Sequence, residues 1–451
     1  MQLTQSGSRQ NGQKVEYWAI VRSRPRLLHL IAITAVFATS VVATLSWAWT
    51  GGADELGLTY GPQTNPTVTM PRHGIPLVPP MAEPGVPVIP GQPTPEPLPP
   101  GATPTPGAAT AEPGAKPTGE TPGRAAPPRP VDGNCETGHK LIPSCGILWG
   151  VAPGAFTEKR GKTALAAFEK KTERHQDVYH AYHKGNTQLF PTTEEEQIAR
   201  EPGRERILFL NWKPSGASWA KIAKGDKATD AFLDRLAKHI KKEFPEQFFF
   251  TVHHEAEDNV REKKGSGYTA EDYSDMYRHV VKRLRANGVD NLVTVLVHMA
   301  YVPHTTQKWF DAMYPGDDVV DWIGFDTYAY SDPGYGHGDF AELLNRQSSA
   351  RPTWPGFYNW ATKRHASKPL MVAEWGVWSS KKNPGHKAEF YREVGKQIKK
   401  FPKIRAMVAF DTPHNQNGRD SRVDATPEAL KAYRQLGRLD VFQVEVKTVL
   451  P

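Results

Sequence analysis

The sequence predicts an α/β protein whose main domain is a (β/α)8 TIM barrel, preceded by one transmembrane helix and a disordered Pro-rich tether. Three observations predict this architecture. Eight short apolar runs alternate with amphipathic segments after residue 145, one long uncharged run lies near the N-terminus, and prolines crowd the region between them. The chain of 451 residues is long enough for one large domain in addition to these N-terminal segments.

The eight apolar runs are the expected strands of the barrel. Near-continuous apolar strands that alternate with helices are typical of a parallel sheet covered by those helices. Eight such units in roughly 300 residues fit a closed barrel better than an open doubly wound sheet. No Gly-rich phosphate loop follows any of the runs, which disfavours a nucleotide-binding domain. The runs are GILWGVAPG (146–154), DVYHAYH (177–183), RILFLNWKP (206–214), FFFTVHHEAE (248–257), NLVTVLVHMA (291–300), VDWIGFDTYAY (320–330), PLMVAEWGVW (369–378) and IRAMVAFDTP (404–413).

The uncharged run from Leu27 to Trp49 predicts a membrane anchor. As a helix it would span roughly 34 Å at ~1.5 Å per residue, which matches the hydrocarbon core of a bilayer. Arg22, Arg24 and Arg26 precede it and predict a cytoplasmic N-terminus, with the rest of the chain outside. A cleaved signal peptide is the alternative, because Ser46-Trp47-Ala48 resembles a small-residue cleavage site. With either an anchor or a cleaved signal peptide, the rest of the chain is exported.

The predicted organisation is a basic cytoplasmic tail (1–26), a signal-anchor or signal peptide (27–49), a Pro-rich disordered linker (50–132) and a catalytic barrel domain (133–445). Proline fixes φ and lacks an N–H, so the linker should form neither helix nor sheet but an extended tether with polyproline II character. We therefore expect a single-pass membrane protein with an extracellular barrel domain, or a secreted protein if the segment is cleaved.

The cysteines and the net charge indicate which covalent link and which kinds of partner to expect. An exported domain permits a disulfide between Cys135 and Cys145, and two unpaired thiols are the alternative. The formal net charge is +8, but no dense Arg/Lys stripe with interleaved aromatic residues is present, so a nucleic-acid partner is not expected. The basic balance would suit an anionic wall or membrane surface, or simply a solvated lysine-rich surface. We expect a monomer.

Two of the apolar runs end on a glutamate. Barrel enzymes place their chemistry at the carboxyl ends of the strands. The fourth run leads into Glu255 and the seventh into Glu374, and a carboxylate at the end of a buried strand is costly unless it faces a functional cleft. Two carboxyl groups facing across a pocket suit glycoside hydrolysis, in which one protonates the leaving oxygen and the other attacks the anomeric carbon. A separation of roughly 5–5.5 Å would predict retention of configuration.

These motifs resemble the clan A retaining glycoside hydrolases, in particular glycoside hydrolase family 26, best known for endo-β-1,4-mannanases. The resemblance rests on His254-Glu255, on VDWIGFDTY around Tyr328, and on MVAEWGV around Glu374 and Trp375. It implies a (β/α)8 fold, Glu255 as acid/base, Glu374 as nucleophile, Tyr328 as the group that orients Glu374, and His254 in contact with the sugar or Glu255. The resemblance extends from Gly146 to about Pro413.

The chain also departs from that pattern. Ala256-Glu257-Asp258 follow the His-Glu pair, and the eighth run ends Phe410-Asp411, where the clan more often has a tryptophan platform. The resemblance therefore supports the assignment of the catalytic residues more strongly than it supports a particular sugar specificity. A mannan-like or related β-glycan is one candidate substrate, and a β-glucanase, a xylanase or a cell-wall polymer hydrolase is the alternative. A non-catalytic carbohydrate-binding or wall-attachment barrel is the alternative of another class.

Other strand-end residues are weaker candidates for substrate contacts. Trp149, Trp212 and Trp375 could stack on sugar rings, and His298 follows the fifth run; packing in the core is the alternative for each. A metal site at HHEAED is not expected, because Asp258 replaces the second histidine of an HExxH motif. No cofactor is expected. Strict strand alternation would turn His254 away from the face of Glu255, so its predicted role requires a twist or bulge there.

Overall fold

The computed structural model describes residues 135–155, 157–333, 337–415 and 418–447. The predicted cytoplasmic tail, anchor and Pro-rich linker lie outside the described residues. Within the described ranges, no helix has both the length and the apolar character that crossing a bilayer requires.

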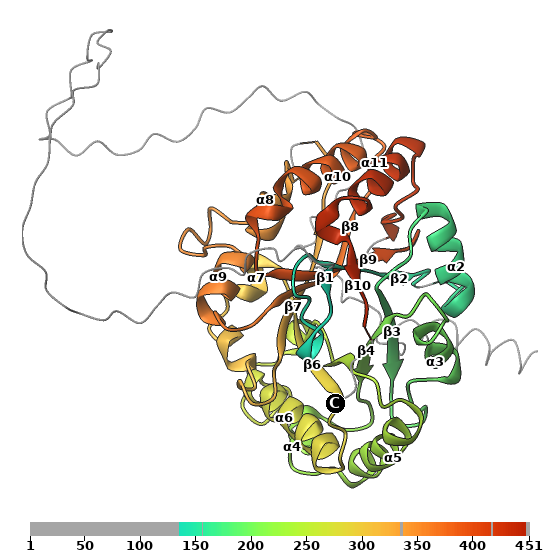
Figure 1. Cartoon of the computed structure of the whole chain (residues 1–451). Coiled ribbons are helices and arrows are strands. Elements are labelled where there is room, and N and C mark those ends of the chain that lie inside the picture. Colours follow the sequence, from blue (N-terminus) through green and yellow to red (C-terminus); the bar gives the residue numbers. More distant parts are fainter. Residues whose placement is uncertain (1–134, 156, 334–336, 416–417, 448–451) are drawn as a thin grey trace, which may run out of the picture. The chain divides into compact units, whose positions relative to one another are not determined.

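Eight parallel strands close into a barrel in chain order, which confirms the predicted (β/α)8 fold (Figure 1). Each strand pairs with the next along the chain, and the last pairs with the first, Leu148 with Ala406 through Pro153 with Asp411. Every predicted apolar run contains one barrel strand. The strands are β2 (Leu148–Pro153), β3 (Val178–Lys184), β4 (Ile207–Lys213), β5 (Phe248–Val252), β6 (Leu292–Met299), β7 (Trp322–Ala329), β8 (Leu370–Val377) and β9 (Ile404–Asp411).

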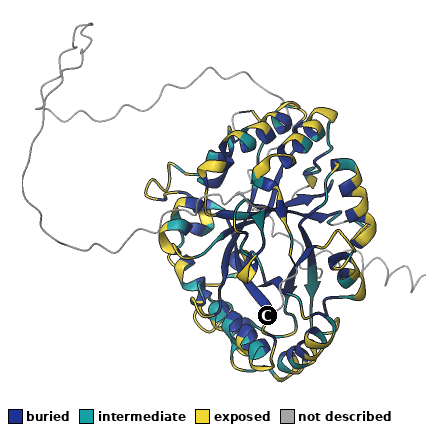
Figure 2. Cartoon of the chain, viewed as in Figure 1, coloured by how far each residue is buried: buried dark blue, intermediate teal, exposed yellow. Residues whose placement is uncertain are grey.

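Helices surround the barrel, with their buried faces toward the strands and their exposed faces outward (Figure 2). The described α-helices are α2 (Gly161–Thr172), α3 (Thr193–Ala199), α4 (Trp219–Ala223), α5 (Lys227–Glu243), α6 (Ala270–Ala286), α7 (Val302–Thr305), α8 (Phe340–Leu344), α9 (Phe357–Arg364), α10 (His386–Gln397) and α11 (Pro427–Gly437). The described 3-10 turns are η1 (His139–Leu141), η2 (Ala256–Asn259), η3 (Phe310–Met313), η4 (Ile398–Lys400) and η6 (Asp440–Phe442).

The long helices begin where the sequence supplies caps. Thr269 and Asp272 form a reciprocal capping box at the start of α6, and the Asp226 side chain accepts a hydrogen bond from the Thr229 amide at the start of α5. Each cap satisfies backbone N–H groups that the first helical turn leaves without a partner. These caps explain why the amphipathic segments begin at these residues.

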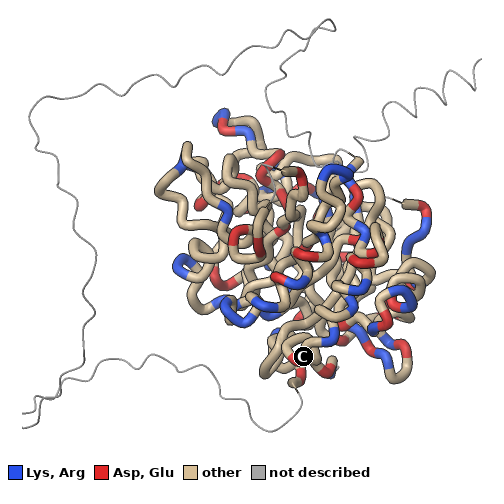
Figure 3. The backbone as a smooth tube through the Cα atoms, turned by 90° about the horizontal axis from the view of Figure 1, so that it is seen from above, with Lys and Arg blue, Asp and Glu red and all other residues tan. Residues whose placement is uncertain are grey.

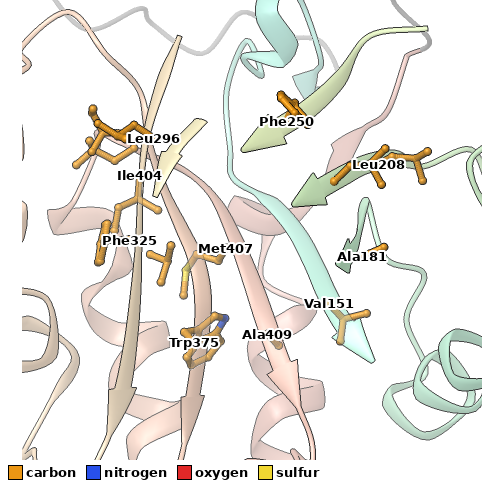
Figure 4. Close-up of a cluster of buried hydrophobic side chains, with 14 of the residues drawn as sticks. Val151, Ala181, Leu208, Phe250, Leu296, Phe325, Trp375, Ile404, Met407 and Ala409 are labelled. Atoms are coloured by element: carbon orange, nitrogen blue, oxygen red, sulfur yellow. The ribbon is translucent and has the colours of Figure 1, made fainter. Parts of the chain in front are cut away.

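Strand alternation divides the buried side chains into two clusters. The inner cluster fills the barrel and includes Phe209, Phe249 and Val408. The outer cluster packs between strands and helices, and Figure 4 shows part of it. Because successive side chains point to opposite faces, the inner cluster fixes which strand-end residues face the barrel axis.

The N-terminal end of the barrel is closed by the first and last described segments. β1 (Cys135–Glu136) pairs in parallel with β10 (Val444–Glu445), and Val444 packs against the inner cluster. Cys135 and Cys145 form a disulfide in this region. The chain therefore enters the described domain at the end opposite to the carboxyl ends of the strands.

Basic and acidic residues are interspersed over the barrel domain in the view of Figure 3. Many of the surface charges pair locally, for example Arg278 with Asp318 and Arg283 with Asp234.

Candidate active site

The carboxyl ends of the strands carry a layer of inward polar and aromatic side chains. Val178 of β3 belongs to the inner cluster, so alternation turns Tyr182, four residues later, toward the barrel axis as well. On β9, Val408 faces inward and so does Phe410. The Phe410 ring lies 6.1 Å from that of Tyr182 and 6.2 Å from that of Tyr328 on β7. These rings form an apolar wall beside the acidic groups of the site.

A β-bulge on β8 turns Glu374 inward. Ala373 already faces the barrel interior, so strict alternation would point Glu374 outward. The register with β7 shifts at this point: Phe325 pairs with Val372, and Asp326 pairs with Glu374. The extra residue restores the inward direction at Glu374, as bulges near active sites commonly do.

Three side chains hold the Glu374 carboxylate. The Tyr182 hydroxyl donates to Oε1 and the Tyr328 hydroxyl donates to Oε2, each over 2.7 Å. His254 Nε2 lies 3.3 Å from Oε1. Burial, reinforced by the charge of Glu374, raises the pKa of both tyrosines well above its ordinary value, so they remain protonated donors near neutral pH. The carboxylate is thus oriented from both oxygens.

Two left-handed residues follow β5 and break its alternation. His253 and Glu255 have φ angles of 50° and 51°, a conformation uncommon outside glycine. His253 therefore turns away from the site, where its Nδ1 accepts from Trp219 Nε1 over 3.0 Å. His254 instead reaches Glu374 and contacts the amide of Asn211. The twist that a site role for His254 requires is present.

Glu255 is buried, with 8% of its surface exposed, and lies among other acids. Its amide donates to Val297 O over 3.3 Å. Burial raises the pKa of its carboxyl well above the usual range, and the negative charges of Asp326, Glu374, Asp258 and Glu257 raise it further. A carboxyl group that keeps its proton near neutral pH can serve as a general acid.

Asp326 is a third buried acid at the centre of the site. It pairs with Glu374 across the bulge and is 3% exposed. Among the described residues no side chain donates to its carboxylate, and the Glu374 backbone amide is the donor that lies near it. Burial, followed by the charges of Glu374 and Glu257, raises the pKa of Asp326 well above its ordinary value. The sequence analysis missed this residue, although its spacing of two from Tyr328 gives both the same inward direction.

His254, Asp326 and Glu374 also form a group that could hold a metal ion. One ligand atom from each lies within 4.8 Å of the others. Both oxygens of Glu374 already accept hydrogen bonds from Tyr182 and Tyr328, which would compete with an ion. The observed contacts therefore fit an oriented carboxylate better than a metal ligand.

A cavity of about 520 Å³ adjoins Tyr182 and Phe410. This volume lies in the range of small-molecule sites, and the cavity is lined by the tyrosine that holds Glu374. Its walls come from the ends of β2 and β3, the start of α3 and the end of β9. Its polar lining residues are Arg160, Tyr179, His180, Tyr182, His183, Gln188, Thr192, Thr193, Glu194 and Glu195.

The prediction that Trp149, Trp212 and Trp375 contact substrate is wrong. All three are at most 1% exposed and face the outer cluster, as Figure 4 shows for Trp375. Trp149 packs edge-on against Trp375 at 5.8 Å, and Trp212 stacks on Phe232 of α5 at 5.4 Å. The physical reason is alternation: each tryptophan follows an inward residue by one position, so its ring points toward the helices.

The prediction that His298 contacts substrate is also wrong. His298 is 1% exposed, and its Nδ1 lies 2.7 Å from Glu257 Oε1. Its ring packs near Phe310, Phe357 and Trp360 on the outer side of β6. His298 therefore contacts the segment that follows Glu255 and does not line the site.

Aromatic groups do approach the site from the end of β8. Trp378 lies parallel to Tyr328, with ring centroids 5.3 Å apart. The Arg419 guanidinium lies 4.4 Å from the Trp378 ring and 4.8 Å from the Tyr330 ring. Trp378 therefore packs on the ring of Tyr328, whose hydroxyl donates to Glu374.

Comparison with known proteins matches part of this barrel to a family. Residues 222–353 match the family model for glycosyl hydrolase family 26. The matched segment includes His254, Glu255, Asp326 and Tyr328, and it ends before Glu374.

Curated relatives and solved structures add further similarities. The chain is 26% identical over 284 residues to Endoglucanase H of Acetivibrio thermocellus, covering 61% of this chain and 29% of that protein. It is 25% identical over 177 residues to a β-1,3-xylanase of an Alcaligenes species, covering 36% of this chain and 37% of that protein. The chain thus spans about a third of the length of these relatives.

A family 26 β-mannanase from Bacteroides ovatus is similar in structure, with a TM-score of 0.46, 16% identity and coverage of 67% of this chain and 90% of that one. The resemblance to glycosyl hydrolase family 26 that the motifs indicated is confirmed by the family model over residues 222–353.

Proposed function

We propose that the barrel domain is a retaining glycoside hydrolase that cleaves β-linked polysaccharide by double displacement. The observation that carries the proposal is the pairing of two unlike carboxyl groups. Glu374 is held from both oxygens by Tyr182 and Tyr328, and Glu255 lies close enough for the charge of Glu374 to raise its pKa. Where the surroundings of two carboxyl groups give them different pKa values, the group with the higher pKa serves as the acid and the other as the base or nucleophile.

In the first step, Glu374 attacks the anomeric carbon as the bond to the leaving oxygen breaks. Glu255 gives its proton to that oxygen, and a covalent glycosyl-enzyme results. In the second step, the Glu255 carboxylate removes a proton from water, the water oxygen bonds to the anomeric carbon, and Glu374 is released. The mechanism expects a carboxyl separation of roughly 5–5.5 Å. Tyr328 and Tyr182 orient Glu374, and His254 stands beside it at the sugar.

The substrate class follows from the family match and the relatives. Their names include an endoglucanase and a β-1,3-xylanase, so a mannan, a β-glucan and a xylan are all candidates for this chain. We propose a mannan-like or related β-glycan, with β-glucan, xylan or another wall polymer as the alternative. No cofactor takes part in the proposed steps.

The proposal is tested with Glu374→Ala on a panel of β-1,4-mannan, β-1,4- and β-1,3-glucans, and β-1,4- and β-1,3-xylans. Wild type should cleave at least one glycan, and the variant should lose at least about 10³-fold in kcat, as removal of a nucleophile typically does. The exposed Glu428 on α11 provides a control, Glu428→Ala, which should keep full activity. If wild type binds a glycan but cleaves none, the domain is a binding module.

We propose further that the domain works outside the cell. The support is the charge pattern around residues 27–49 and the proline content of residues 50–132, which suit an anchor and a tether. The catalytic domain would then extend over 133–445 and act as a monomer. Alkaline carbonate extraction of membranes should leave the full chain in the pellet and release a chain lacking residues 1–49. Release of a chain shortened at its N-terminus would favour a cleaved signal peptide.

A further inference from the structure

The short turn after Glu255 is fixed by three side-chain contacts with histidines. In η2, Glu257 Oε1 lies 2.7 Å from His298 Nδ1, and Asp258 Oδ1 lies 2.8 Å from His304 Nε2. The third contact joins Asn259 Oδ1 and His253 Nε2 over 2.9 Å. Three successive residues of one turn are thus each tied down, which is unusual for a loop at a strand end.

The contact of Glu257 is the buried one. Glu257 is 2% exposed and His298 is 1% exposed. The same Oε1 also accepts from the Met299 amide over 3.3 Å. Glu255 is attached to the same stretch of β6, because its amide donates to Val297 O over 3.3 Å. The end of β6 therefore holds both Glu255 and the residue two positions after it.

These contacts restrain the backbone at Glu255. Glu255 has a left-handed backbone, which non-glycine residues adopt only where the surroundings enforce it. The turn that follows Glu255 supplies that enforcement through Glu257. A small displacement of an acid from its leaving oxygen would slow proton transfer while leaving the sugar site intact.

We propose that Glu257 and His298 are positioning residues that hold Glu255 in place for proton donation to the leaving group. The proposal rests on the function proposed above and deepens it by assigning the residues that follow the His-Glu pair. Neither side chain touches the substrate; both act through Glu255.

Electrostatics supports the same pair. The negative charge of Glu257 is one of the groups that raise the pKa of Glu255. The other charged groups that face Glu255 are Asp326 on β7, Glu374 on β8, Asp258 on η2 and Lys213 on β4. Glu255 must be protonated to donate, so kcat/KM falls as the pH rises through its pKa. Removal of the Glu257 charge lowers that pKa, and the basic limb of the pH profile should move to lower pH.

The turn offers its own control. Asp258 and His304 form a pair on the same turn, but both side chains are 21% exposed. Asp258→Asn removes a charge and weakens a contact of the turn near solvent, where ion pairs contribute little. Because the charge of Asp258 also contributes to the raised pKa of Glu255, this variant should likewise move the basic limb to lower pH, but its leaving-group dependence should match that of wild type.

The decisive experiment varies the leaving group. Each variant is assayed on the glycan that wild type cleaves and on a 2,4-dinitrophenyl β-glycoside of the same sugar, whose leaving group needs no proton. Glu257→Ala should lower kcat/KM on the glycan by about tenfold or more. On the dinitrophenyl glycoside it should lower kcat/KM by less than about threefold, while kcat and KM fall together because the second step still needs Glu255 as a base. A structural defect would lower both activities equally, and that result overturns the proposal.

Glu257→Gln separates charge from geometry, since it keeps the volume and the oxygen that contacts His298. Its basic limb should move to lower pH, while its leaving-group dependence stays close to that of wild type. An unmoved basic limb overturns the electrostatic part of the proposal. If the alanine variant unfolds, His298→Asn tests the positioning role. His298→Asn should reproduce the leaving-group effect of Glu257→Ala.

Failure of the positioning role can be distinguished from failure of the proposed function. If Glu374→Ala keeps wild-type activity, the retaining mechanism fails whatever the Glu257 variants do. If Glu374→Ala is inactive and Glu257→Ala loses the glycan and aryl activities equally, only the positioning role fails.

Discussion

Glu374 accepts hydrogen bonds from two tyrosines that come from opposite sides of the barrel. Tyr182 lies on β3 and Tyr328 on β7, so the carboxylate is fixed by strands far apart in sequence. A buried carboxylate held from both oxygens loses rotational freedom, which favours one angle of attack on the anomeric carbon.

Replacement of Tyr328 by phenylalanine should impair chemistry more than binding. A hydrogen bond to a charged group contributes about 1.5–3 kcal/mol, so Tyr328→Phe should lower kcat roughly ten- to hundredfold with little change in KM. Steady-state kinetics on the cleaved glycan measure both. Tyr391→Phe is the matched control, because that ring packs outside the barrel against Trp375. An unchanged kcat in Tyr328→Phe would remove Tyr328 from the site.

The stability of the folded protein should depend on pH through Asp326. The folded state raises the pKa of Asp326, so folding favours its protonated form. Above about pH 4 the unfolded carboxyl ionises, and wild type loses stability relative to Asp326→Asn as the pH rises toward the folded pKa. Below that pH the difference between their unfolding temperatures should not depend on pH, because the carboxyl is protonated in both the folded and the unfolded state. Calorimetry over pH 3 to 8 measures the difference, and parallel curves would contradict it.

The same variant should shift the pH dependence of catalysis. After burial, the charge of Asp326 is the largest contribution that raises the pKa of Glu255. Asp326→Asn should therefore move the basic limb of kcat/KM to lower pH. This residue-scale network was only partly predictable. Glu255 and Glu374 were recognised from the His254-Glu255 and MVAEWGV motifs, whereas Asp326 and Tyr182 are recognised only once the direction of each strand is known.

At the scale of elements, strand alternation explains both the success and the failure of the sequence analysis. All eight strands were predicted, because each is a continuous apolar run bounded by polar segments. The inward face was not predictable from those runs, since a strand buried on both sides has apolar residues at every position. Trp149, Trp212 and Trp375 were therefore assigned to the site although they face the helices.

Two backbone irregularities carry the site. The bulge on β8 redirects Glu374, and the left-handed residues after β5 redirect His254. Neither irregularity has a clear signal in the sequence, because no glycine marks the bulge or the turn. The need for a twist at His254 could be inferred only from the motif and the rule of alternation.

The outer position of Trp149 has a direct consequence. Trp149→Phe should lower the free energy of unfolding by about 1–3 kcal/mol, because the ring packs against Trp375, Tyr433 and Phe442. Its KM and kcat should stay within about twofold of wild type at temperatures where the variant is folded. Denaturant titration and steady-state kinetics test the two statements. A large rise in KM with unchanged stability would return Trp149 to the site.

At the scale of the molecule, the two ends of the barrel have separate tasks. The disulfide, β1 and β10 lie at the N-terminal end of the barrel, and the acids and the cavity lie at the opposite end. This division is general for (β/α)8 enzymes, whose chemistry sits at the carboxyl ends of the strands.

The barrel was predictable because the number and spacing of apolar runs determine it. The cavity walls were not, since residues such as Glu194 and Arg160 come from connections between the strands. Connections vary independently of the strands, so their side chains carry no periodic signal.

The central claim is double displacement by Glu374 and Glu255, and the anomeric configuration of the first product tests it most directly. Proton NMR during cleavage of the preferred β-glycan should show the β-anomer of the new reducing end first, followed by slow mutarotation to the equilibrium mixture. Initial appearance of the α-anomer would mean a single displacement by water and would contradict the nucleophilic role of Glu374.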